Sequence, residues 1–115
     1  MAYDEELAER IRELVSELGA VTEQRMFGGL SFFVGGHMAV AASGQGGLLV
    51  RVAPADGERL IASSSAEPME MRGRALRGWL RVPAEKVRTK RQLAPWVTRG
   101  TAYAASLPPK EPGHR

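Results

Sequence analysis

Short apolar runs separated by glycines constrain the fold of this chain more than any other feature. Gly28-Gly29, Gly35-Gly36 and the loop 43–47 divide residues 21–52 into short segments. Glycine takes positive φ without penalty, so a glycine pair suits the tight turn of a hairpin. Parallel neighbours need a connection of about a dozen residues or more, and these segments are too short to supply one. The sequence therefore predicts an antiparallel sheet made of hairpins.

Alternating apolar residues predict four strands in this region and two more after it. The first is expected at about 21–27 and the second at 30–34; the third carries Met38, Val40 and Ala42, and the fourth carries Leu48, Val50 and Val52. The last two are expected near 69–72 and 78–82, joined by residues 73–77. We expect Trp79 or Leu80 to anchor the final strand in the core. Burial of Trp79 is favoured because apolar residues flank it.

Two helices are predicted before and after the first four strands. Residues 5–18 begin at Asp4 as N-cap, end before Gly19, and share an apolar face made of Leu7, Ile11, Leu14, Val15 and Leu18. Pro54 can begin a second helix over residues 55–63, because its missing N–H is not needed there. In that helix Leu60 and Ile61 are expected to face inward.

A third helix is predicted to reach Leu107. Thr89 with Gln92 resembles a capping box, which would place the helix start at residue 90. Pro95 conflicts with this start, because proline inside a helix clashes with the preceding turn. Either the helix begins nearer Pro95 or its first turn is irregular.

The expected order of elements is α-β4-α-β2-α. Hairpin connections with terminal helices favour an α+β fold, an antiparallel sheet with flanking helices, over a parallel sheet. The chain has 115 residues, which is enough for one domain with one core. We expect a single domain over residues 1–109 and a disordered tail over 110–115.

The chain is poor in residues that carry catalysis or hold metals. It has no cysteine, which excludes disulfides, thiol catalysis and cysteine-ligated metal. His37 and His114 belong to no ligand-spaced cluster, and His37 is expected to be an exposed turn residue. No phosphate-binding loop is present, and no nucleophile elbow surrounds Ser63-Ser64-Ser65. We therefore expect no metal, no cofactor and no enzymatic activity.

The N-terminal segment does not have the pattern of a signal peptide. Asp4, Glu5 and Glu6 make it acidic, whereas a signal peptide begins with a basic stretch followed by an apolar run. No apolar stretch approaches the roughly 20 residues that span a bilayer. We therefore expect a cytoplasmic protein without a membrane partner.

Charge is distributed unevenly along the chain. Residues 1–60 hold 5 Arg and 9 Asp or Glu, whereas residues 61–115 hold 11 Lys or Arg and 4 Asp or Glu. Such a split indicates an anion-binding face, a self-complementary surface, or a solvated surface without a partner. The candidates for contact with an anion or nucleic acid are Arg72, Arg74, Arg77, Arg81, Arg88, Lys90 and Arg91.

The run Arg25-Met26-Phe27-Gly28-Gly29, followed by Phe32, is the most specific signature in the chain. We interpret its glycines as a structural turn or bulge, with Phe27 and Phe32 in the core. Together with Pro68-Met69, Trp79 and Leu93-Ala94-Pro95-Trp96, the run resembles the N-terminal domain of the TfoX/Sxy family of bacterial competence regulators.

The resemblance implies an antiparallel α+β domain similar to the secretion-chaperone-like architecture, in a bacterial cytoplasmic protein. It implies transcriptional coactivation through a partner regulator, and it supplies no catalytic residues. In the full-length regulators a second, helical domain follows this one. We expect the present domain to stand alone.

Three functions remain open at this point. The first is a non-enzymatic regulatory module that binds a protein partner or forms a homodimer. The second is direct binding of nucleic acid through the basic segment 72–91. The third is an enzyme or small-molecule binder with a pocket near Arg25, Phe27 and Gly28-Gly29.

Overall fold

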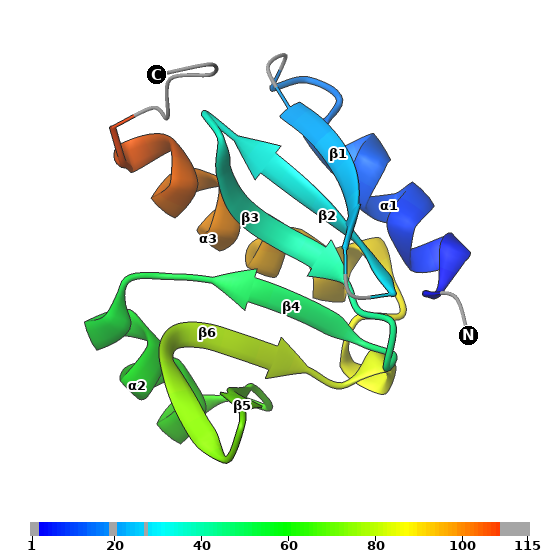
Figure 1. Ribbon diagram of the computed structural model, residues 1–115. Helices are drawn as coiled ribbons and strands as arrows, with labels where there is room; N and C mark the ends of the chain where they lie inside the picture. Colours follow the sequence, from blue (N-terminus) through cyan, green and yellow to red (C-terminus); the bar gives the residue numbers. More distant parts are fainter. Residues whose placement is uncertain (1–2, 19–20, 27, 109–115) are drawn as a thin grey trace.

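One six-stranded sheet forms the centre of the molecule (Figure 1). The computed structural model describes residues 3–18, 21–26 and 28–108. Its strands are β1 (Val21–Met26), β2 (Gly29–Val34), β3 (His37–Ala42), β4 (Leu48–Arg51), β5 (Glu67–Met71) and β6 (Arg74–Val82). Its helices are α1 (Glu5–Val15), α2 (Pro54–Ser63) and α3 (Lys90–Ser106), with a 3-10 turn η1 at Ala84–Lys86. The predicted α+β fold and the order of its elements are therefore confirmed.

The strands lie side by side in the order β1-β2-β3-β4-β6-β5, and every pair is antiparallel. The hairpin between β2 and β3 turns at Gly35 and Gly36, whose φ angles are 60° and 84°. Two consecutive positive φ angles are what a two-residue hairpin turn demands, so a glycine pair is favoured there. The predicted turn is therefore confirmed.

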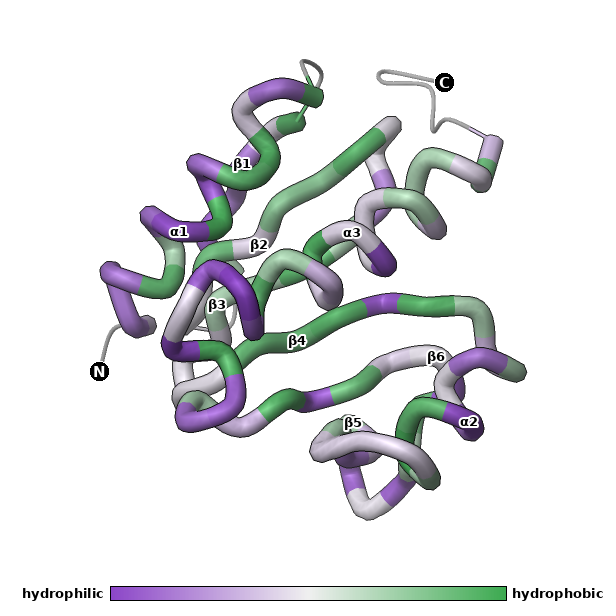
Figure 2. The backbone as a smooth tube through the Cα atoms, turned by 180° about the vertical axis from the view of Figure 1, so that it is seen from behind, coloured by the Kyte–Doolittle hydropathy of each residue, from purple (hydrophilic) through white to green (hydrophobic). Residues whose placement is uncertain are grey.

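The three helices cover the same face of the sheet. Figures 1 and 2 view the molecule from opposite sides, and the helices lie behind the sheet in the first and before it in the second. Helix α3 packs on β2, β3 and β4, α1 packs on α3 and β3, and α2 packs on β6 and β5. No described helix is long and apolar enough to span a membrane. The second face of the sheet carries no helix among the described residues.

The core fills the space between the sheet and these helices. Its fully buried large side chains come from every layer: Phe32, Leu7, Ile11, Leu48, Leu80, Leu93, Val40, Val50, Val82 and Val87. Phe32, expected in the core, is 0% exposed. Phe27, the other aromatic expected there, lies outside the described residues. Burial of apolar side chains is the main stabilising term, at roughly 25 cal/mol per Å².

The last strand differs from its prediction in two ways. Strand β6 begins at Arg74, so the hairpin turn is only Arg72-Gly73 and not the whole stretch 73–77. Leu80 is 1% exposed and anchors the strand, whereas Trp79 is only half-buried. Successive strand residues point to opposite faces, so Trp79 lies on the face away from the helices. The predicted burial of Trp79 in the core is therefore wrong.

The first two helices are shorter or more exposed than predicted. Asp4 caps α1 as expected, and its carboxylate accepts hydrogen bonds from the amides of Glu6 and Leu7 at 3.0 and 3.2 Å. The helix ends at Val15, which leaves Leu18 53% exposed, and Gly19 lies outside the described residues. In α2, Ile61 faces solvent instead of the core.

Helix α3 keeps its early start despite Pro95. The capping box is formed, because Thr89 accepts from the Gln92 amide at 3.1 Å and the Gln92 side chain accepts from the Thr89 amide. Pro95 therefore lies inside the helix, and its missing N–H deprives only the Arg91 carbonyl of a bond. This loss falls close to the helix start, where the capping box already fixes the first turn.

His37 is less exposed than predicted for a turn residue. It lies at the start of β3, is half-buried, and its Nε2 is 2.7 Å from the carbonyl oxygen of Pro108. Its Nδ1 is buried without a hydrogen-bond partner among the described residues. The ring therefore links the sheet to the segment that follows α3.

Charged side chains join α1 to the elements beside it. Arg12 holds Glu23 of β1 through Nε and Nη2 at 2.7 and 3.1 Å, and it also reaches Glu9. The hydrogen bonds with Glu23 are the main cause of a raised Arg12 pKa. Lys90 at the start of α3 lies 2.9 Å from Glu13. These exposed pairs orient α1 but add little stability individually.

At Gly100, α3 approaches β3 too closely to leave room for a side chain. A Cβ there would collide with the Ala39 carbonyl oxygen and would lie 2.8 Å from Cγ1 of Val40. Ala39 lies at the register shift between β2 and β3, where the strand backbone bulges. Only glycine therefore lets the helix axis come this close to β3.

Gly100→Ala and Gly57→Ala should change stability in opposite directions. At Gly100 the added methyl meets backbone, so we expect the free energy of unfolding to fall by about 1–2 kcal/mol even though alanine favours the helix. At Gly57 of α2 the nearest atoms are 3.5 Å away, an ordinary contact, so alanine should add about 0.5 kcal/mol. Urea unfolding monitored by circular dichroism measures both; stabilisation by Gly100→Ala would contradict the close packing.

Candidate functional site

The open face of the sheet presents apolar side chains that no described helix covers. Strand pairing places Ser31, Ala41, Leu49 and Arg81 in one row across β2, β3, β4 and β6. The next row on β4 and β6 pairs Arg51 with Trp79. Residues two apart on a strand share a face, so Leu49 and Arg51 lie together, as do Trp79 and Arg81.

These rows line a groove of about 640 Å³, which we call the sheet groove. Its apolar side chains come from all six strands of the sheet: Met26, Phe33, Met38, Leu49, Met69, Leu76 and Trp79. Its charged side chains are Arg51, Arg72, Arg81 and Glu70. Its size is that of a ligand or peptide site.

The β5–β6 hairpin forms one wall of the sheet groove. Gly78 of β6 has φ 82°, and its carbonyl accepts a hydrogen bond from the Val52 amide at 2.8 Å. The register between β5 and β6 shifts between Pro68 and Glu70, beside this bend. The bent hairpin brings Leu76 and Met69 to the groove, where they line it together with residues of β1 to β4.

Arg81 is held in place by neutral groups. Its Nη2 donates to the Gly46 carbonyl at 3.1 Å, and its Nη1 lies 3.4 Å from Oγ of Ser43. Ser43 is buried, and its hydroxyl also accepts from the Gln45 amide at 3.1 Å. The loop 43–47 therefore fixes the guanidinium at the groove without neutralising its charge.

Arg51 is held by aromatic rings. Its guanidinium carbon lies 5.2 Å from the ring centre of Trp79 and 5.6 Å from that of Tyr103 on α3. A cation near two aromatic faces is stabilised by their quadrupoles and keeps its charge. Arg51 therefore lies at the boundary between the sheet groove and the helix layer.

The glycines of the signature run are explained by a contact between two loops. A Cβ on Gly29 would lie 2.5 Å from the Ala42 carbonyl oxygen, and a Cβ on Gly44 would lie 2.6 Å from the Gly28 carbonyl oxygen. The turn between β1 and β2 is thus packed directly on the loop that holds Arg81. Met26 and Gly29 line the sheet groove, whereas Arg25 is exposed on β1.

The cations of the basic segment do not all lie together. Arg72, Arg74 and Arg77 are at the β5–β6 hairpin, and Arg77 lies 3.5 Å from Glu58 of α2. Arg81 lies in the sheet, and Arg88, Lys90 and Arg91 are at the start of α3. Of these seven, only Arg72 and Arg81 line the sheet groove. Nucleic-acid binding through the whole segment stays a prediction.

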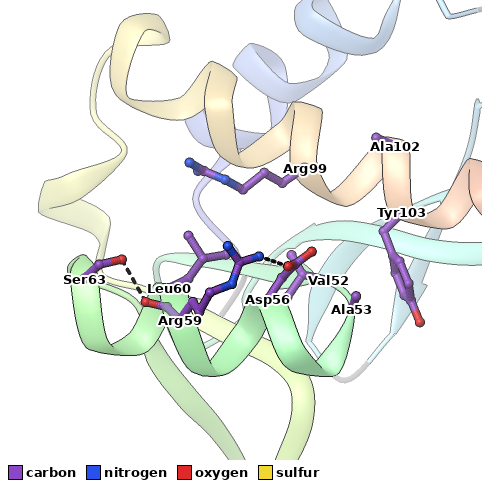
Figure 3. Close-up of a pocket in the computed structure, with 9 residues that line it drawn as sticks. All are labelled: Val52, Ala53, Asp56, Arg59, Leu60, Ser63, Arg99, Ala102 and Tyr103. Carbon is purple, nitrogen blue, oxygen red and sulfur yellow. Dashed lines mark hydrogen bonds and ion pairs between the residues drawn. The ribbon is translucent and has the colours of Figure 1, made fainter.

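A second, smaller cleft of about 520 Å³ lies between α2 and α3. Figure 3 shows Arg59 turned toward Asp56 of its own helix, with which it forms an ion pair, and Arg99 extending from α3 above them. Arg99 also lies 4.7 Å from the ring centre of Trp96. The cleft therefore holds cations that already have partners.

Guanidinium groups outnumber carboxylates in the lining of both cavities. Among residues 3–18, 21–26 and 28–108, no group of three or more His, Cys, Asp or Glu could hold a metal. The charged groups of the sheet groove are guanidiniums and one carboxylate, which suit recognition of an oppositely charged surface.

Sequence reasoning missed most of this site. Of the residues that line the groove, the sequence patterns indicate only Met26, Gly29, Arg72 and Arg81 as candidate site residues. The signal was available in β4, where Leu49 and Arg51 occupy the face opposite Leu48 and Val50. An apolar residue on each face of a strand indicates that both faces are covered or used.

A family model matches most of the chain. The family model described as the TfoX N-terminal domain matches residues 13–104. The chain matches no curated protein and no solved structure. The matched region contains all six strands and most of α3.

Gly44→Ala should loosen the loop that supports Arg81. Its methyl would meet the Gly28 backbone, so we expect a loss of about 1–3 kcal/mol in the free energy of unfolding. Gln45→Ala is the matched control, because Gln45 is exposed in the same loop and should change stability by less than about 0.5 kcal/mol. Equal melting temperatures for the two variants in thermal unfolding would refute the loop contact.

Proposed function

The chain belongs to the TfoX N-terminal domain family, and from this premise we propose that it is a regulatory module that binds a protein partner in the sheet groove. The observation that carries the proposal is the groove itself, where apolar side chains from six strands stay partly exposed on the helix-free face. Exposed apolar patches on a folded domain mark interaction sites.

The composition of the groove supports a protein partner. Three of its apolar residues are Met26, Met38 and Met69, whose flexible side chains adapt to the shape of a partner. Trp79 adds a large aromatic side chain, and Arg51 and Arg81 lie beside it. Tryptophan and arginine are the residues most enriched at the energetic centres of protein interfaces.

The proposal extends to the biological setting. The resemblance to competence regulators implies a partner that is itself a regulatory protein, and a module of this kind works without catalysis. We propose that the domain acts in the bacterial cytoplasm, as the family resemblance implies.

A photo-crosslinking amino acid at position 49 tests this function. Leu49 lies at the floor of the sheet groove, and the matched control is Ile61, an exposed apolar residue on α2 outside the groove. In cells that express each variant, we expect position 49 to crosslink to a defined segment of one polypeptide, and position 61 to give no such product.

The outcome is read by mass spectrometry of the crosslinked peptides. A second substitution, Trp79→Asp in the same variant, should abolish the product at position 49, because it places a charge on the floor of the groove. Equal crosslinking from positions 49 and 61, or crosslinks only to nucleic acid, would contradict the proposed function.

A further inference from the structure

We propose that the sheet groove selects a segment whose apolar and acidic side chains alternate on one face, so that its occupant is an acidic peptide of a partner protein. This inference rests on the proposed function and adds the chemistry of the partner. It follows from the charges of the groove and from their arrangement.

The first argument is unmatched positive charge. Arg51, Arg72 and Arg81 line the groove against a single acid, Glu70. Within the described part of the chain, none of these three arginines forms an ion pair, whereas Arg12, Arg59, Arg77 and Lys90 each pair with a carboxylate. The groove therefore keeps its positive charge available for a carboxylate from outside.

The second argument is that two of these cations are already fixed in position. Arg81 is held by the Gly46 carbonyl and Ser43, and Arg51 lies near the rings of both Trp79 and Tyr103. All of these partners are neutral. A guanidinium that is pre-ordered yet still charged binds a carboxylate with little further loss of side-chain entropy.

The third argument is the pattern on the floor of the groove. Leu49 of β4 is opposite Arg81 of β6, and Arg51 of β4 is opposite Trp79 of β6. Cations and apolar side chains therefore alternate both along the strands and across them. Neighbours on one face are about 5–7 Å apart. An extended peptide repeats at the same spacing every second residue, so apolar and acidic side chains two residues apart match this floor.

The same pattern favours a polypeptide over a nucleic acid. Single-stranded nucleic acid is held by a series of aromatic platforms together with cations. The groove has Trp79 and Phe33 as its aromatic residues, and the remaining apolar lining is methionine, leucine and alanine. These are contacts for aliphatic side chains.

Fluorescence anisotropy with designed peptides tests the inference. The probe is a fluorescein-labelled peptide with the repeat Leu-Ser-Glu-Ser, and the matched peptide replaces each Glu by Gln. At about 0.05 M salt the acidic peptide should bind at least tenfold more tightly than its Gln counterpart. Raising salt to about 0.5 M should remove most of this difference, because the Debye length shrinks.

Variants of the protein locate the effect. Arg81→Gln and Arg51→Gln should each weaken binding of the acidic peptide about tenfold and leave the Gln peptide unchanged. Arg72→Gln tests the rim of the groove. Arg72 is exposed, so this substitution should leave the chain folded. Arg74→Gln is the control, since Arg74 is exposed on β6 but does not line the groove, and it should bind like the unmodified chain. Circular dichroism checks that each variant is folded.

Each other result overturns the inference in a distinguishable way. Equal binding of both peptides, lost in Leu49→Asp, would refute acidic selection and leave the proposed function standing. A self-association of the chain that Leu49→Asp abolishes would identify a second copy as the occupant. Displacement of the acidic peptide by oligothymidine at lower concentration than by unlabelled peptide would identify nucleic acid. Binding of neither peptide by the folded chain would refute acidic selection, and the crosslinking at position 49 then decides the proposed function by itself.

Discussion

The close contact of Gly100 with the Ala39 carbonyl brings the helix layer onto one face of the sheet. It lets α3 lie directly on β3, where Leu93 and Val97 complete the core, and α1 in turn packs on α3. The buried apolar side chains of α1 and α3 therefore lie on this one side. The opposite face keeps Leu49 and Trp79 partly exposed, because nothing in the described chain is positioned to cover them.

Glycines also shape the face that stays open. The contact of Gly28 and Gly29 with Gly44 holds the loop 43–47 against the β1–β2 turn, and the bend at Gly78 brings the β5–β6 hairpin to the other side of the groove. These backbone contacts fix the loop that binds Arg81. The signature run thus acts on the site through backbone packing, and the charged side chains of the groove come from elsewhere in the chain.

Local patterns predicted the elements, but tertiary contacts decided the site. The turn at Gly35-Gly36, the Asp4 cap and the Thr89 capping box depend on neighbours in the sequence, and all three are confirmed. Alternation shows that a strand has two faces but not which one the helices cover, so Trp79 was assigned to the core. The contact of Arg51 with Tyr103 joins residues far apart in the chain, and no local sequence pattern predicts it.

The central claim is that a partner occupies the open face of the sheet, and the two tryptophans of the chain allow a direct measurement. Trp79 lies in the groove, and Trp96 of α3 belongs to the buried core. In a proton–nitrogen NMR spectrum, the indole N–H signal of Trp79 should shift when the crosslinked partner segment is added as a peptide, and the signal of Trp96 should stay in place. A shift of Trp96 alone, or no shift of either at saturating peptide, would contradict the account.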